Sequence, residues 1–405
     1  MLALVRLYYP WVSISGTVPT GGPVILVANH PNGLLDPAVL AAALRRPVSF
    51  LAKSTLFGNP AGAFLMNTFR AIPVYRAKEA DTAQNEHTFA RCREILAEGG
   101  WIALFPEGVS HDASGLLPLK TGAARIALGA GVPLRVVPVG ILYEDKDIFR
   151  SRVALAFGDP VVVEAGEETS EAVRELTERI AGELGEVVLQ ARDREIWRGL
   201  LLVAAWEGGG LGRVEARARE LADVWRRLAL RDPARLEALA DAVRAYVRRL
   251  ETLGVRDPLA IEAAPPSVVP SFLPLLVAAP LALVGALLGW APYRLVRVVA
   301  NRLAGPNQDL VSTFKIFGGL FFIGGTWIVE AVAAAWWLGP LASLAVFLVA
   351  PATGLIALRW DESLTRRREA FLAGRVARKQ RLAEALAERR RELLAAVADA
   401  ERDAG

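Results

Sequence analysis

A histidine and an aspartate close together in the N-terminal part of the chain are well placed to do chemistry. His30 follows the apolar run Val24–Ala28, and Asp36 lies at the start of a stretch rich in Leu and Ala. The run has the length and β-branched content of a buried strand, and the later stretch favours a helix. A carboxylate that holds one ring nitrogen of a histidine leaves the other nitrogen free to take a proton. The pattern predicts a general base, although a histidine at a helix start and an aspartate in its first turn can also serve structure alone.

A second loop that carries a carboxylate follows another apolar run. Pro106, Glu107 and Gly108 come soon after Trp101–Leu104. Proline stiffens a turn, and glycine allows another group to approach the backbone closely. This loop is therefore predicted to bind a substrate, with Glu107 either positioning the substrate or ordering the loop. His111 in the same loop is the alternative base, although a structural role suits it better.

Two cations lie at the ends of predicted elements. Arg76 follows the strand predicted over 71–74, and Lys120 precedes a helix start at Thr121. An arginine at a strand end can bind a phosphate through two parallel hydrogen bonds, and helix N-termini favour anions. Both cations are candidates for holding a phosphate, although Arg76 taken alone would better suit a solvated ion pair at the surface.

These loops belong to a stretch in which strands and helices alternate. The predicted strands are Val12–Ile14, Val24–Ala28, Val48–Ala52, Ala71–Val74, Trp101–Phe105, Leu134–Val139 and Val153–Phe157, and the predicted helices are Leu34–Leu44, Ala61–Phe69, Thr82–Glu98, Thr121–Leu128 and Glu167–Arg192. Such alternation predicts an α/β fold with a mostly parallel central sheet flanked by helices. Ligands of these sheets bind at the carboxyl ends of the strands, where the loops above begin.

Composition restricts the class of protein. The 405 residues allow two or three domains, and 53% of them are hydrophobic, with the excess concentrated between residues 268 and 358. The formal net charge is +4, and basic residues cluster beside the apolar excess, which favours an anionic membrane surface over nucleic acid. No nucleic-acid module or zinc-binding spacing is present in the sequence, and the single Cys92 excludes an internal disulfide.

The apolar region predicts membrane-embedded helices. Val268–Trp290 is long enough to span a bilayer but is interrupted by prolines, and a second block over 316–358 is divided by Gly339 and Pro340. Basic residues flank the second block on both sides, which places both flanks in the cytoplasm. We therefore expect a helical hairpin, preceded by a proline-bent re-entrant or interfacial element. Three full spans would place the basic loop outside and are less favoured.

The domain organisation follows from these segments. We predict a catalytic domain over 1–192, a helical module over 193–263, a membrane-embedded helical region over 264–360 and a charged C-terminal helix over 361–405.

Four blocks, taken in order, resemble the glycerolipid acyltransferases. The blocks are Asn29-His30 with Asp36, the Ala-Ile-Pro-Val-x-Arg sequence that ends at Arg76, Phe105-Pro106-Glu107-Gly108, and Val137-Pro138-Val139. They fall within roughly residues 1–190. Five residues rather than the usual four separate His30 from Asp36, and Gly108 is followed by Val-Ser-His-Asp. Both departures resemble the branch that contains the fungal-type glycerol-3-phosphate/dihydroxyacetone-phosphate acyltransferases. The spacing leaves open whether Asp36 or Asp112 contacts His30.

The resemblance implies an O-acyltransferase of phospholipid biosynthesis. It would move a fatty acyl group from acyl-CoA or acyl carrier protein to a hydroxyl of glycerol 3-phosphate or dihydroxyacetone phosphate. The implied roles are His30 as base, Asp36 as its orienting carboxylate, and Arg76, Glu107, Gly108 and Lys120 as acceptor-binding residues. No metal or prosthetic group is implied, and the expected partners are the acyl thioester, the phosphorylated acceptor and membrane lipids, without nucleic acid.

Two alternative functions stay open beside the acyltransferase, and the sequence also predicts a location. Acylation of 1-acylglycerol 3-phosphate (lysophosphatidate) is an alternative within the family, and a catalytically silent membrane scaffold is an alternative outside it. A lipid hydrolase is disfavoured because the sequence has no Gly-x-Ser-x-Gly motif. The expected location is a membrane with the catalytic domain on its cytoplasmic face, the inner membrane if the source is bacterial.

Overall fold

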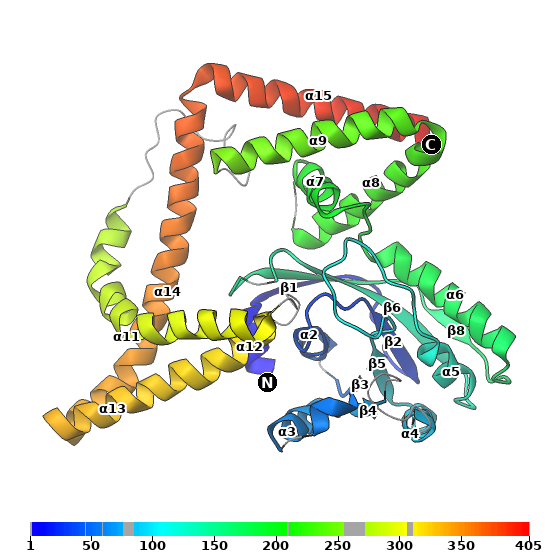
Figure 1. Ribbon diagram of the computed structural model, residues 1–405, viewed down its shortest axis with the longest axis horizontal. Helices are drawn as coiled ribbons and strands as arrows, with labels where there is room; N and C mark the ends of the chain where they lie inside the picture. The colour runs from blue at the N-terminus through cyan, green and yellow to red at the C-terminus, as the bar shows by residue number, and fades with distance from the viewer. Residues whose placement is uncertain are drawn as a thin grey trace. The chain divides into compact units, whose positions relative to one another are not determined.

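The computed structural model describes residues 2–44, 46–58, 60–75, 85–146, 148–208, 210–254, 272–305 and 311–404 (Figure 1). The chain divides into two compact units. Unit 1 comprises Met1–Asp223 and Asn307–Thr313, and unit 2 comprises Val224–Pro306 and Phe314–Gly405. The predicted boundaries at 192/193 and 263/264 stay predictions.

Unit 1 is built on an eight-stranded sheet, counted over the described residues. Its strands are β1 (Trp11–Gly16), β2 (Val24–Ala28), β3 (Ser49–Lys53), β4 (Ile72–Val74), β5 (Trp101–Leu104), β6 (Leu134–Tyr143), β7 (Arg152–Phe157) and β8 (Val161–Val163). The order is β1-β7-β6-β2-β5-β3-β4, with β8 also paired to β6. All neighbours are parallel except β6–β7 and β6–β8. The predicted α/β class with a mostly parallel sheet is confirmed.

Helices flank this sheet (Figure 1). The helices of the first part of unit 1 are α1 (Leu2–Tyr8), α2 (Leu35–Leu44), α3 (Pro60–Thr68), α4 (Asn85–Ala97), α5 (Gly122–Leu128), α6 (Ser170–Val187), α7 (Arg194–Ala205) and α8 (Leu211–Arg231), the last of which crosses into unit 2. Ile25 and Val27 of β2 share one core with buried residues of α4, α5 and α6, including Cys92. Leu26 points to the other face and is also fully buried, so both faces of β2 are covered.

The position of β2 determines where the functional loops meet. It lies between β5 and β6 and is parallel to both. Their carboxyl ends therefore lie at the same edge of the sheet, and the loops that follow them at residues 29–34, 105–121 and 144–151 begin there. Short strands buried on both faces give these loops a rigid base.

Unit 2 contains the long apolar helices. They are α11 (Leu273–Ala304), α12 (Val311–Gly318, which begins in unit 1), a π-helical stretch (Gly319–Ile323), α13 (Gly324–Leu338) and α14 (Pro340–Ala377). Thr313–Leu338 and Pro340–Thr365 are each long and apolar enough to cross a membrane, and they meet at Gly339. Leu273–Gly289 and Pro292–Leu303 pass the same test as a pair bent by 48°.

The first apolar block departs from the expected interruption at its prolines. Within the described residues, α11 continues through Pro280, and its bend of 48° lies at the break before Pro292. It packs closely on α14: a Cβ on Gly285 would lie only 2.0 Å from the carbonyl oxygen of Thr353, and the indole of Trp360 donates to the carbonyl of Leu275 at 2.8 Å. Packing against a neighbouring helix can stabilise a helix that contains proline.

The charged C-terminal segment has a partner within unit 2. Residues 361–377 continue α14, and α15 (Gln380–Ala404) packs on α9 (Pro233–Leu253). Arg235 of α9 forms an ion pair with Asp403 of α15.

Candidate functional site

The side chain of Asn29 determines where the chain leaves the sheet. Its amide nitrogen donates to the carbonyl of Ile141 at 3.1 Å, and its amide oxygen accepts from the Ile141 N–H at 2.7 Å. The side chain thus continues the pairing between β2 and β6 in place of a backbone peptide. The main chain is free to turn away from β6, and the next residue, His30, starts the loop.

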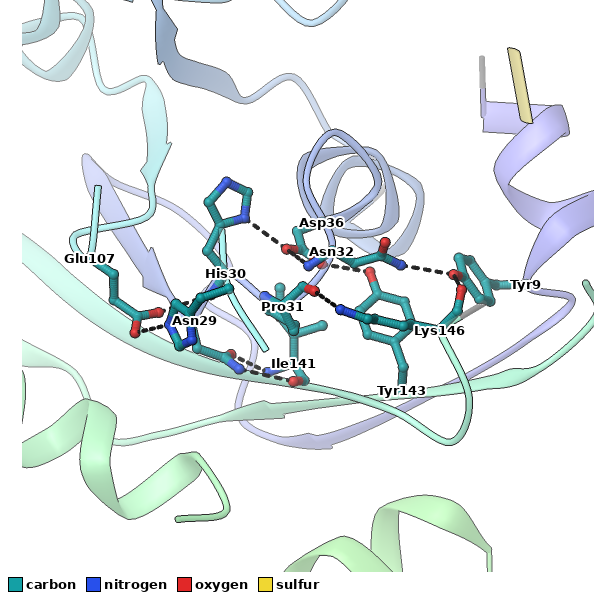
Figure 2. Close-up of polar contacts among 11 residues, drawn as sticks. Tyr9, Asn29, His30, Pro31, Asn32, Asp36, Glu107, Ile141, Tyr143 and Lys146 are labelled. Atoms are coloured by element: carbon teal, nitrogen blue, oxygen red, sulfur yellow. Dashed lines mark hydrogen bonds and ion pairs between the residues drawn. The ribbon is translucent and has the colours of Figure 1, made fainter. Parts of the chain in front are cut away.

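His30 and Asp36 form a hydrogen-bonded pair. The distance from His30 Nδ1 to Asp36 Oδ2 is 2.8 Å (Figure 2). The imidazole stacks on the ring of Phe105, with the ring centroids 4.0 Å apart. A turn closed by Leu35 N–H to the Asn32 carbonyl accommodates the five intervening residues. Asp36, rather than Asp112, is therefore the residue that contacts His30. Within the described residues, Nε2 of His30 has no hydrogen-bond partner.

The Asp36 carboxylate is fully buried and fixed at both oxygens. Oδ2 also accepts from the Asn32 N–H at 2.8 Å, and Oδ1 accepts from the hydroxyl of Tyr143 at 2.7 Å. Burial, followed by the charge of Asp36, raises the pKa of Tyr143 well above its usual value, so its hydroxyl remains a donor. Asp36 cannot turn without breaking several hydrogen bonds at once.

Glu107 is also buried, and both its oxygens are bound within the protein. Oε1 accepts from the backbone N–H of His30 at 3.0 Å, and Oε2 accepts from that of Leu117 at 2.7 Å. The distance from Oε2 to His111 Nε2 is 2.5 Å, and His111 Nδ1 accepts from the Ala113 N–H at 3.1 Å. This network assigns the proton of a neutral His111 to Nε2 and leaves neither ring nitrogen open. The geometry favours loop ordering for Glu107 and His30 over His111 as base.

Lys120 lies across the glycine of the same loop. Gly108 has φ +76°, and a Cβ there would be 3.4 Å from Cγ of Lys120. The backbone N–H of Lys120 donates to the Pro106 carbonyl at 2.7 Å. The side chain is exposed and has no ion-pair partner within the described part of the chain. Arg76 lies outside the described residues, so its place relative to this loop stays a prediction.

Sequence reasoning missed four residues that support the pair. The Tyr9 hydroxyl accepts from Asn32 Nδ2 at 2.9 Å and donates to the Lys146 carbonyl at 2.6 Å. Lys146 Nζ donates to the Pro31 carbonyl at 3.0 Å. Tyr143 is the fourth, and a signal existed for it: a polar aromatic at the end of an apolar strand. Nothing local marks Tyr9, Asn32 or Lys146.

The described side chains were compared with the ligand sets that metal ions require. Over the described ranges, no group of three or more His, Cys, Asp or Glu side chains could hold a metal ion.

Residues 12–142 match the family model described as Acyltransferase, and this range contains the whole His30–Asp36 network except Tyr9, Tyr143 and Lys146. Glycerol-3-phosphate O-acyltransferases 2 and 1 of Saccharomyces cerevisiae are 32% identical to this chain over 196 residues and 36% identical over 131 residues. These matches cover 44% and 29% of this chain but only 26% and 17% of the yeast proteins.

Two further similarities concern proteins named for a related acceptor. A chloroplastic 1-acyl-sn-glycerol-3-phosphate acyltransferase of Brassica napus is 31% identical over 124 residues, covering 31% of this chain and 34% of that protein. The crystal structure of the 1-acyl-sn-glycerophosphate acyltransferase of Thermotoga maritima gives a TM-score of 0.33 and 24% identity, covering 44% of this chain and 72% of that one. The strand order, rather than this low score, defines the fold.

Proposed function

Residues 12–142 form an acyltransferase-family domain, and from this premise we propose that the protein is a membrane acyltransferase of phospholipid biosynthesis. It transfers a fatty acyl group from acyl-CoA or acyl carrier protein to a hydroxyl of glycerol 3-phosphate or dihydroxyacetone phosphate. One observation carries the proposal: a buried carboxylate holds His30 at Nδ1, and Nε2 is left without a partner in the described structure.

The proposed chemistry begins with His30. Its Nε2 takes the proton of the acceptor hydroxyl while the hydroxyl oxygen forms a bond to the thioester carbonyl carbon. Asp36 keeps the Nδ1 proton in place and stabilises the imidazolium that results. When the tetrahedral intermediate collapses, the carbon–sulfur bond breaks and the thiolate takes the proton from His30. Holding both substrates beside one base makes the bimolecular step effectively unimolecular.

Acceptor binding is assigned to the loops around this base. The exposed ammonium of Lys120, whose stem lies over Gly108, supports a role in holding the acceptor phosphate. Arg76 is proposed as the second phosphate ligand on its sequence position alone. Glu107 is proposed to act through the loops that it joins, because both its oxygens are used inside the protein.

Two observations favour glycerol 3-phosphate as the acceptor. The two yeast relatives are named for glycerol 3-phosphate, and the five-residue spacing between His30 and Asp36 resembles the fungal-type branch. We therefore place glycerol 3-phosphate first. The plant relative is named for 1-acylglycerol 3-phosphate, which makes that lysolipid the second candidate. A silent scaffold is a lower alternative, because the base and its carboxylate are both present.

The membrane location is argued from unit 2. Thr313–Leu338 and Pro340–Thr365 form a candidate hairpin, and Trp336 and Trp337 beside its turn are largely exposed, as suits an interfacial position. Basic residues flank both ends in the sequence, which favours a cytoplasmic location for both. The bent helix α11 is proposed as a re-entrant or interfacial element.

A transfer assay tests the function directly. Detergent-solubilised protein is given labelled acyl-CoA or acyl carrier protein with glycerol 3-phosphate, dihydroxyacetone phosphate or 1-acylglycerol 3-phosphate, each in a separate reaction. His30→Ala is assayed beside His87→Ala, a matched control because His87 is exposed on α4. We expect transfer to one acceptor, lost only in His30→Ala. Absence of transfer in every combination would reject this set of substrates.

A further inference from the structure

Tyr143 touches the one oxygen of Asp36 that neither His30 nor the loop backbone holds. Its hydroxyl donates to Oδ1 at 2.7 Å, whereas His30 Nδ1 and the Asn32 N–H bind Oδ2 (Figure 2). Within the described residues, Tyr143 is the only donor to Oδ1. Together with the two donors to Oδ2, the hydroxyl fixes the rotation of the carboxylate about its Cβ–Cγ bond.

The direction of this hydrogen bond is fixed by the surroundings. Tyr143 and Asp36 are both buried, so water does not compete for the contact. Burial raises the pKa of the phenol, and the negative charge of Asp36 raises it further. The phenol stays protonated, and a carboxylate has no hydrogen to give, so the hydroxyl donates and the carboxylate accepts.

The strand end that carries Tyr143 is tied to the His30 loop at other points. Asn29 pairs with the backbone of Ile141 in β6, and Lys146 just after β6 donates to the Pro31 carbonyl and pairs with Asp112 at 2.9 Å. These contacts hold the donor and the loop in one arrangement before any substrate binds. A hydrogen bond fixed in advance can set an orientation without being reorganised during the reaction.

We propose that Tyr143 is a positioning residue, which locks the Asp36 carboxylate so that the proton of neutral His30 stays on Nδ1 and Nε2 remains the basic nitrogen. Tyr143 acts through Asp36 and does not itself touch the reacting atoms. The inference rests on the proposed function only in that His30 is taken as the base; the hydrogen-bond chain and its effect on the tautomer exist without any substrate.

The test uses two variants of the whole 405-residue chain, each of which lacks one tyrosine hydroxyl. Tyr143→Phe removes the donor to Asp36. Tyr9→Phe is the matched control, because it removes a buried hydroxyl from the same cluster whose hydrogen bonds are to Asn32 Nδ2 and the Lys146 carbonyl. Thermal unfolding of both variants measures the loss of stability that each suffers when a buried hydroxyl is removed.

The deciding measurement is the ¹⁵N spectrum of labelled histidine. The chain has three histidines, so His87→Ala and His111→Ala assign the His30 signals. We expect Tyr143→Phe to shift the ¹⁵N resonances of neutral His30 from the values of the Nδ1–H tautomer toward those of a mixture of tautomers. Tyr9→Phe should leave these ¹⁵N chemical shifts close to those of wild type. In transfer assays we expect kcat to fall about tenfold in Tyr143→Phe, with KM for the acceptor unchanged.

The outcomes separate this inference from the function on which it builds. If the His30 nitrogen shifts of Tyr143→Phe equal those of wild type or of Tyr9→Phe, the positioning role is overturned, whatever the transfer assay gives. If the shifts move as expected while the wild type transfers no acyl group, the positioning role stands and the proposed reaction falls.

Discussion

Two histidine–carboxylate pairs follow neighbouring strands of the sheet, and they differ in the hydrogen bonds of the histidine ring. His30 and Asp36 lie after β2 with 2.8 Å between Nδ1 and Oδ2. Glu107 and His111 lie after β5 with 2.5 Å between Oε2 and Nε2. Both carboxylates are buried, and both histidine side chains are about equally accessible, at 17% and 18%. Distance and burial alone do not tell the two pairs apart.

The difference lies in the second nitrogen of each ring. His111 accepts a backbone hydrogen bond there, whereas Nε2 of His30 has no partner in the described structure. The carboxylates differ as well: Glu107 binds two backbone N–H groups from separate loops, and Asp36 binds one backbone N–H and a tyrosine hydroxyl. A base needs an oriented ring and an open nitrogen, and only the first pair offers both.

The largest effect should come from removing the open nitrogen. We expect His30→Ala to lower kcat by about 10³–10⁴-fold, because positioned general-base catalysis contributes on that order. Thermal unfolding of the variant should remain close to wild type, since the ring is partly exposed and only one of its nitrogens is bound. Full activity of His30→Ala, with loss of activity in His111→Ala, would reverse the assignment.

The next largest effect should come from neutralising the first carboxylate. Asp36→Asn keeps the shape of the side chain but presents an amide that can hold the wrong tautomer of His30. We expect kcat to fall by about 10²–10⁴-fold, no further than in His30→Ala, with the acceptor KM within about twofold of wild type. Steady-state kinetics checks this split. A rise in KM at constant kcat would instead assign Asp36 to substrate binding.

A smaller effect, mainly on stability, should follow from the second carboxylate. Glu107→Gln replaces one carboxylate oxygen with an NH₂ group. Oε1 accepts from the His30 N–H, and Oε2 accepts two hydrogen bonds, so at least one partly buried donor loses its acceptor. We expect a loss of about 1–3 kcal/mol in the free energy of unfolding. A denaturant titration followed through signals from unit 1 measures this loss of stability. Unchanged stability with a raised acceptor KM would show that Glu107 contacts substrate.

The smallest effect should come from replacing His111, whose two ring nitrogens are both hydrogen-bonded within the protein. His111→Ala removes one hydrogen bond to Glu107, whose oxygens keep their backbone donors. We expect about 1 kcal/mol lower stability and a kcat within about fivefold of wild type. Assays of His111→Ala beside His30→Ala, on the same acceptor, make the contrast quantitative. Equal losses in both variants would erase the distinction between the two pairs.

The sequence was sufficient for the class of fold and for the position of His30. Strands of β-branched residues alternated with helices, and β2 was predicted with its observed bounds, so His30 was correctly placed at a strand end. The resemblance to acyltransferases that rested on four short blocks is confirmed by the family match over 12–142. The contact between His30 and Asp36 could not be decided from their spacing, because it depends on the turn that Leu35 and Asn32 close.

The residues that were missed depend on contacts between distant parts of the chain. β6 was expected to end at Val139, but residues 139–143 pair with β7, and that pairing carries the strand on to Tyr143. β8 is three residues long and follows Pro160, which is too short for a periodic pattern. α11 continues through Pro280, and nearby Gly285 packs on Thr353 of α14, which lies 68 residues later in the sequence.

Cys92 has a practical consequence for placing the apolar helices in a membrane. It is the single cysteine of the sequence, it is fully buried, and burial raises the pKa of its thiol to about 12. At neutral pH it should stay protonated and inaccessible, so maleimides should not label the folded wild type. The natural sequence therefore serves as a silent background for labelling. A cysteine placed at Leu341 or at Arg381 would be the one reactive thiol, and an impermeant reagent applied to sealed vesicles would report which side each residue faces.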